Sequence, residues 1–279
     1  MDNDLLIPAP GERIDSINDD LRLLQRVDGL TFGTDAYLLS AFLRPSPKAK
    51  AAELGGGTGV LSLLALTKNK AATVDVYEIQ PDFATLCRRN AMLNGLDHRM
   101  QVLCQDVRQI PAETGLDVVY TNPPYMKADC GRENAVSAMN IARREVHGDI
   151  GDFCGAADRL LKHGGTFSLV YRPERLCDLF SALRAHHMEP KRVVFVYPTA
   201  ADRPCLVLVE AKKGAAGGTL FAPPLCIYDG ADKTKYTPEM ARIYETGSME
   251  FLFPGTRQRS QAGKKGVDDA NAKSNEDHR

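Results

Sequence analysis

The chain has 279 residues, of which 43% are hydrophobic and 25% are charged, as in an ordinary globular protein with one large domain. Its 35 lysines and arginines balance 36 aspartates and glutamates, which argues against a uniformly basic nucleic-acid-binding protein, so any contact with phosphate needs a local basic patch. The seven cysteines form no CxxC pair, which argues against a zinc site or a disulfide framework and favours a reducing compartment.

Residues 1–49 are expected to form an extension that packs on the main domain. The first 20 residues lack an apolar segment of the signal-peptide type, and no later apolar stretch is long enough to span a membrane, so we expect a cytoplasmic protein. The pattern predicts a short strand pair at residues 21–25 and 30–32, followed by a helix at 35–43.

Residues 50–253 alternate between strand-like and helix-like segments. Strands are predicted at 51–54, 73–78, 100–104, 116–120 and 166–171, helices at 60–66, 82–94, 149–161 and 174–186, and a closing hairpin at 193–196 and 205–209. A glycine pair at 164–165 is expected to stop the third of these helices. This alternation predicts an α/β fold with a mainly parallel seven-stranded sheet, a terminal β-hairpin and helices on both faces.

Residues 254–279 are almost wholly polar and are predicted to be disordered, because they bury too little apolar surface to offset the entropy of ordering. Four cations lie close together there: Arg257, Arg259, Lys264 and Lys265. A solvated tail is the favoured interpretation, and a weak tether for RNA is the alternative.

A glycine-rich loop joins the first strand of the main domain to its first helix. Gly55, Gly57 and Gly59 let the backbone turn tightly and approach a ligand, and the helix that follows presents free N–H groups. With Glu53 before it, this GxGxG spacing resembles the first motif of class I S-adenosyl-L-methionine (SAM) methyltransferases, which have a Rossmann-like fold. The resemblance implies that these four residues contact SAM. Gly56 departs from the usual pattern and is expected to add only flexibility.

Two further acids lie where neighbouring parallel strands end. Glu78 closes the second strand, where a carboxylate can accept both ribose hydroxyls of SAM. Asp106 follows the third strand and can accept the adenine amino group, with Val107 and Ile79 covering the ring. The alternatives are an exposed acid at a strand end for Glu78 and a turn-initiating Asp for Asp106.

The helix predicted at 35–43 begins with Thr34 and Asp35. Either side chain is expected to cap that helix. Both are also counted among the residues expected to contact SAM, with Asp35 near the methionine amino group.

Asn122, Pro123, Pro124 and Tyr125 follow the fourth strand. The prolines fix the backbone, while the Asn122 Oδ1 and the Pro123 carbonyl can accept hydrogen bonds from a planar amino group and Tyr125 can stack on it. Such bonds stabilise the charge that develops on the nitrogen during methyl transfer, so no strong general base is needed. The tetrapeptide resembles the acceptor motif of SAM-dependent methyltransferases that modify an exocyclic or amide nitrogen, and Asn122 is also expected to contact SAM. A proline-rich turn is the plain alternative.

If the acceptor is a base, it must leave its stack to reach this motif, and RNA loops already present unstacked bases. The long connection at 126–147 carries the cations Lys127, Arg132, Arg143 and Arg144, interleaved with acids. Phosphate contact by this loop is only moderately favoured over a solvated loop.

From residue 28 to about 245 the chain resembles the bacterial tRNA1(Val) adenine(37)-N6-methyltransferases. The strings that carry the resemblance are 32–36 (Phe-Gly-Thr-Asp-Ala), 53–59 (Glu-Leu-Gly-Gly-Gly-Thr-Gly), 122–125 (Asn-Pro-Pro-Tyr), 160–165 (Leu-Leu-Lys-His-Gly-Gly), 223–228 and 236–239. This resemblance implies methylation of the N6 of an adenine in the tRNA anticodon loop, with SAM as donor, S-adenosyl-L-homocysteine as product, tRNA as partner and no metal.

Three other functions stay open at this level. Methylation of a guanine N2 in ribosomal RNA, or of a glutamine N5 in a release factor, uses the same chemistry. The release-factor enzymes usually carry a separate helical N-terminal domain, and the first 49 residues are too few and too strand-like for one. A non-catalytic scaffold with this fold is more remote, since it would tolerate loss of Asn122 or Glu78.

Overall fold

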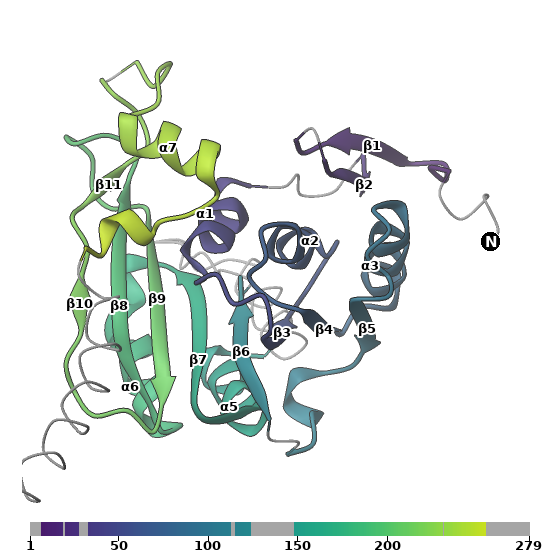
Figure 1. The fold of residues 1–279 in the computed structure, drawn as a ribbon, viewed down its shortest axis with the longest axis horizontal. Helices are drawn as coiled ribbons and strands as arrows, with labels where there is room; N and C mark the ends of the chain where they lie inside the picture. Colours follow the sequence, from purple (N-terminus) through teal and green to yellow (C-terminus); the bar gives the residue numbers. More distant parts are fainter. Residues whose placement is uncertain are drawn as a thin grey trace, which may run out of the picture.

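The computed structural model describes residues 7–18, 20–27, 33–112, 115–123, 148–230 and 232–254, and its centre is a large sheet flanked by helices (Figure 1). The strands of this sheet are β3 (Lys50–Leu54), β4 (Thr73–Glu78), β5 (Met100–Cys104), β6 (Leu116–Thr121), β7 (Leu161–Tyr171), β8 (Met188–Tyr197), β9 (Leu206–Lys213), β10 (Leu220–Phe221) and β11 (Leu225–Cys226). The helices are α1 (Thr34–Phe42), α2 (Val60–Thr67), α3 (Pro81–Leu93), α5 (Ile150–Leu160), α6 (Leu176–Ala185) and α7 (Pro238–Thr246).

The strand order is β10-β8-β9-β7-β6-β3-β4-β5, and β11 also pairs with β8. The strands from β5 to β7 are parallel, and β9 runs antiparallel between β7 and β8, which confirms the mainly parallel sheet and its terminal hairpin. The sheet has nine strands instead of the seven predicted, because the two-residue strands β10 and β11 add to β8. Such short strands leave no alternating pattern in the sequence.

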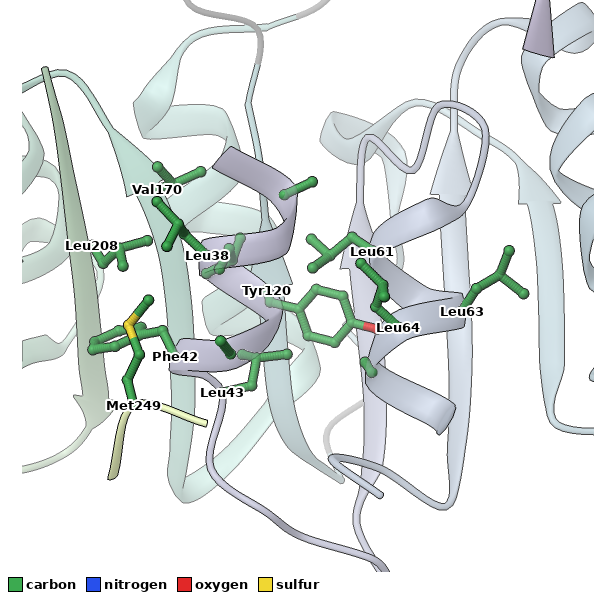
Figure 2. Close-up of a cluster of buried hydrophobic side chains, with 14 of the residues drawn as sticks. Leu38, Phe42, Leu43, Leu61, Leu63, Leu64, Tyr120, Val170, Leu208 and Met249 are labelled. Carbon is green, nitrogen blue, oxygen red and sulfur yellow. The ribbon is translucent and has the colours of Figure 1, made fainter. Parts of the chain in front are cut away.

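Each face of the sheet is covered by its own hydrophobic core. One core joins α1, α2 and α7 to Ala51, Tyr120 and Val170. The other joins α5 and α6 to residues adjacent to these on the same strands, namely Ala52, Val119 and Tyr171. Figure 2 shows Tyr120 of β6 lying between α1 and α2 among leucines of both helices. This period of two is what a strand buried on both faces requires.

The start of β7 differs from the prediction. The chain passes from α5 directly into a strand at Leu161, so Gly164 and Gly165 lie inside β7 instead of stopping the helix. Gly164 has a φ of 78°, and the register between β6 and β7 shifts at Leu116. The glycine pair therefore forms an irregularity in the strand.

The described residues test one half of the predicted N-terminal strand pair and add a strand that was not predicted. β2 (Arg22–Arg26) is present where expected, but it pairs antiparallel with β1 (Glu12–Ser16), and residues 30–32 lie outside the described ranges. The sequence of β1, Glu-Arg-Ile-Asp-Ser, holds one apolar residue and so gives almost no strand signal.

Two asparagines, Asn90 of α3 and Asn94 directly after that helix, form hydrogen bonds with the other edge of β2. The Asn90 amide accepts from the Leu24 N–H at 2.7 Å and donates to the Leu24 carbonyl at 3.0 Å. The Asn94 amide makes the same pair of bonds with Arg22, at 3.0 and 2.7 Å. One turn of helix thus replaces a neighbouring strand, and the β1–β2 hairpin is fixed to the main domain.

Replacing Asn90 by Ala is expected to destabilise the fold by about 3 kcal/mol, because Asn90 is fully buried and its loss leaves buried backbone groups of Leu24 without partners. The matched variant Asn94→Ala should cost about 1 kcal/mol, since Asn94 is partly exposed and water can replace its bonds. Denaturant unfolding measures the free energy of unfolding of both variants. An equal loss of stability in the two would contradict the argument that burial makes Asn90 more important than Asn94.

Candidate active site

The glycine loop, Glu78, Asp106 and Asn122 all follow the carboxyl ends of neighbouring parallel strands, and therefore lie along one edge of the sheet. The loop folds back over β4, since the N–H groups of Gly55 and Gly56 both donate to the Tyr77 carbonyl, at 2.8 and 3.1 Å. This brings the loop to the end of the strand that carries Glu78.

Three glycines of the loop adopt conformations that other residues avoid. Gly55, Gly57 and Gly59 have φ values of 72°, 53° and 83°, in the left-handed region. Gly56 has an ordinary φ, but a Cβ there would lie 2.1 Å from the Val76 Cγ1. The prediction that Gly56 only adds flexibility is therefore wrong, because the close approach of the loop to β4 requires it.

Glu78 is held from two sides by backbone. Its Oε2 accepts from the Gly57 N–H at 2.8 Å and its Oε1 from the Gln80 N–H at 2.9 Å. The side chain is buried, with 5% of its surface exposed. A carboxylate has about four acceptor positions, so these two bonds orient Glu78 and leave it capacity for donors of a ligand.

Glu53 lies beneath the loop. Its carboxyl oxygen accepts from the N–H and hydroxyl of Ser62, and the Ser62 hydroxyl is 2.9 Å from the Tyr120 hydroxyl. Burial raises the pKa of Glu53 from 4.5 to about 8, so Glu53 is protonated at neutral pH. The structure shows Glu53 supporting the start of α2, and its predicted contact with SAM stays a prediction.

The raised pKa of Glu53 is expected to make the protein less stable as pH rises from 4.5 to about 8, because the folded state keeps a proton that the unfolded chain releases. The loss is at most about 1.4 kcal/mol per pH unit, and it levels off above and below that window. Denaturant unfolding as a function of pH measures it. Glu53→Gln, which cannot titrate, should give a flatter profile, and an unchanged profile would contradict the assignment.

Asp35 and Asn122 are in contact although they are far apart in sequence. The Asn122 Nδ2 donates to the Asp35 Oδ2 at 3.1 Å, and the Asp35 Oδ1 accepts from the Ala36 N–H at 2.9 Å. The helix begins differently from the prediction: its N-cap is Gly33, no side chain caps it, and Thr34 is exposed. Asp35 instead lies in the first turn, where a negative charge is favourable.

Asp106 starts a turn and pairs with a cation. Its Oδ1 accepts from the Arg108 N–H at 2.9 Å, which caps the short helix η2 (Val107–Gln109), and its Oδ2 is 2.6 Å from the Arg108 guanidinium. The hydrogen bond from the Arg108 side chain lowers the pKa of Asp106. The turn is thus observed, and the role toward adenine stays a prediction.

The two residues expected to cover the adenine ring differ in exposure: Val107 is buried in the core below the edge, and Ile79 is partly exposed. Pro123 is buried beside Asn122, while Pro124, Tyr125 and the loop at 126–147 lie outside the described residues.

Several residues that support the site were not found from the sequence. The ring of Phe153 lies 3.6 Å from where a Cβ on Gly55 would be, and the Asn90 amide donates to the Thr58 carbonyl at 2.9 Å. Only Ser62 left a signal, as a hydroxyl within the otherwise apolar first turns of α2. The other two depend on contacts between distant segments.

Among the described residues, no three His, Cys, Asp or Glu side chains are grouped so that they could hold a metal ion. Within the same ranges, no helix has both the length and the apolar character needed to cross a membrane. The six cysteines that are described are free thiols.

The sequence pattern of the methyltransferase small domain family matches residues 27–187. The chain belongs to this family. The matched region contains the glycine loop, Glu78, Asp106 and the 122–125 motif, so the edge described above is the part of the chain that the family shares.

Two curated relatives that cover most of this chain carry the same name. The tRNA1(Val) (adenine(37)-N6)-methyltransferase of Dyadobacter fermentans is 28% identical over 78% of this chain and 90% of its own length. The protein of the same name from Porphyromonas gingivalis is 25% identical over 80% of this chain and 91% of its own length.

A solved structure agrees with the fold. A predicted O-methyltransferase of Agrobacterium tumefaciens matches with a TM-score of 0.61 and 22% identity, covering 77% of this chain and 97% of its own. This likeness establishes the Rossmann-like methyltransferase fold that the sequence predicts.

Proposed function

We propose that this protein transfers a methyl group from SAM to the N6 of an adenine in the anticodon loop of a tRNA, and that it works in the cytoplasm. The observation that carries the proposal is the position of Asn122. It lies at the same edge of the sheet as the glycine loop and Glu78, with its amide held by Asp35. The name shared by the curated relatives supports tRNA adenine as the acceptor.

The residues at this edge fit SAM. A Cβ at Gly57 would meet nothing within 4 Å, so the loop has open space beside the fixed Glu78 carboxylate. We assign the ribose hydroxyls to Glu78, the adenine amino group to Asp106 and the methionine portion to the glycine loop and Asp35. When bound, SAM supplies a methyl group activated by its sulfonium.

Asn122 orients the acceptor nitrogen. Asp35 is an acceptor, so it fixes the Asn122 amide with Nδ2 toward itself and Oδ1 turned away. The Oδ1 and the Pro123 carbonyl then accept the two hydrogens of the adenine amino group and stabilise the positive charge that grows on it. The displacement is in line and depends on positioning, so it needs no metal.

Labelled SAM offered together with unmodified tRNA, ribosomal RNA and a release factor tests the proposal. We expect label in tRNA, and mass spectrometry of the digested RNA should identify N6-methyladenosine. Methylguanosine, or label in the release factor, would replace the adenine assignment with one of the alternatives. If no substrate becomes labelled, the proposal of methyl transfer itself is wrong.

A further inference from the structure

Four tyrosines from separate segments form a continuous row of rings. Tyr37 of α1 lies 4.7 Å from Tyr244 of α7, Tyr244 lies 5.0 Å from Tyr236, and Tyr236 stacks on Tyr228 at 5.5 Å with 16° between the planes. These centroid distances are in the range of favourable ring pairs. We call this row the tyrosine ladder.

The ladder lies at the same edge of the sheet as the candidate site. The N–H groups of Ile227 and Tyr228 bond to Tyr197 and Pro198, where β8 ends, and β8 points the same way as the parallel strands. At its other end the ladder reaches Tyr37, two residues after Asp35 on α1. Figure 1 shows α1 and α7 beyond the end to which β6 points.

Apolar residues anchor this part of the chain in the core, and three of the tyrosines, Tyr37, Tyr228 and Tyr244, are partly buried against the same core. Met240 and Ile243 are the fully buried residues of α7. In the segment that precedes α7, Leu225 and Ile227 are buried. Tyr236, in the middle of the ladder, has 44% of its surface exposed. Tyr236 therefore offers ring surface to a ligand, and the other three tyrosines hold it in place from the core side.

Two lysines near the ladder lie close to aspartates. Lys233 lies 3.4 Å from Asp202, and Lys235 lies 3.9 Å from Asp229. The chain as a whole has a net charge of −1. The feature that distinguishes this surface is its aromatic rings, which can bind unpaired bases by stacking.

We propose that the tyrosine ladder stacks an unpaired base of the RNA substrate next to the adenine that is methylated. This rests on the proposed function, and extends the RNA-binding surface from the acceptor motif across α1 to the C-terminal segment. Any base has a flat face, so the ladder holds the RNA loop open without reading its sequence.

A tryptophan at position 236 provides a direct probe, because the chain contains no other tryptophan. We expect the fluorescence of Tyr236→Trp to be quenched on addition of the tRNA substrate, because the indole ring would stack on a base. The matched control is Phe221→Trp. Phe221 is 60% exposed and lies on β10. This strand pairs with β8 at Arg192 and Val193, several residues before β8 ends at Tyr197. The fluorescence of a tryptophan at position 221 should therefore not be quenched by tRNA.

Kinetics give the second readout. Tyr236→Ala should raise the KM for tRNA about tenfold and leave the KM for SAM unchanged, and Tyr236→Phe, which keeps the ring, should recover most of this loss. Phe221→Ala is the control and should behave as wild type. Absence of quenching in Tyr236→Trp, or a wild-type KM for tRNA in Tyr236→Ala, would overturn the ladder proposal. If the wild-type enzyme does not methylate tRNA at all, the proposed function fails, which is a different result.

Discussion

Replacing Asn122 by Ala is expected to lower the rate of methyl transfer by about a hundredfold or more, while SAM still binds. In the proposed mechanism this change removes the oxygen that accepts an amino hydrogen of the acceptor, and loss of one such group in a preorganised site typically costs this much. The glycine loop and Glu78 are held by backbone contacts that do not involve Asn122. Single-turnover assays and calorimetry with SAM measure the two effects separately. Full activity in this variant would place the acceptor elsewhere.

The contact between Asn122 and Asp35 offers a sharper control. Asp35→Asn keeps the size of the side chain but replaces an acceptor-only group with an amide that can also donate, so Asn122 is no longer fixed in one orientation. We expect kcat to fall by about tenfold in this variant, less than in Asn122→Ala, because the correct orientation is still populated. Equal kcat values for Asp35→Asn and the wild type would show that the orientation of the amide is set by other contacts.

Replacing Glu78 by Ala is expected to weaken SAM binding by about a hundredfold, because the change removes the carboxylate to which we assign two charge-assisted hydrogen bonds with the ribose. The change also removes the acceptor for the Gly57 and Gln80 N–H groups, which loosens the glycine loop. Calorimetry with SAM measures the affinity. Glu78→Gln should also bind weakly, since its NH2 group meets one of those backbone N–H donors.

Glu239→Ala provides the matched control, because Glu239 is an exposed acid on α7, away from the glycine loop. It should bind SAM as the wild type does. An unchanged affinity of Glu78→Ala for SAM would contradict the assignment of Glu78 to the ribose.

The fold was largely predictable because its signals are local. The alternation of strands and helices and the left-handed glycines are properties of short segments, and the structure confirms both. Prediction failed where the signal was weak or ambiguous. β1 has one apolar residue, β10 and β11 have two residues each, and a glycine pair that usually stops a helix forms an irregularity in β7.

The sequence by itself determined the chemistry: a glycine loop, an acid after the next strand and an Asn-Pro-Pro-Tyr motif, each encoded within a few adjacent residues. Only the tertiary structure decided how these parts are supported. The pairing of Asp35 with Asn122, the asparagines that hold the N-terminal hairpin, and the tyrosine ladder join segments far apart in the chain. Such contacts depend on how the helices pack on the sheet, and the pattern of residue types along the chain does not specify that packing.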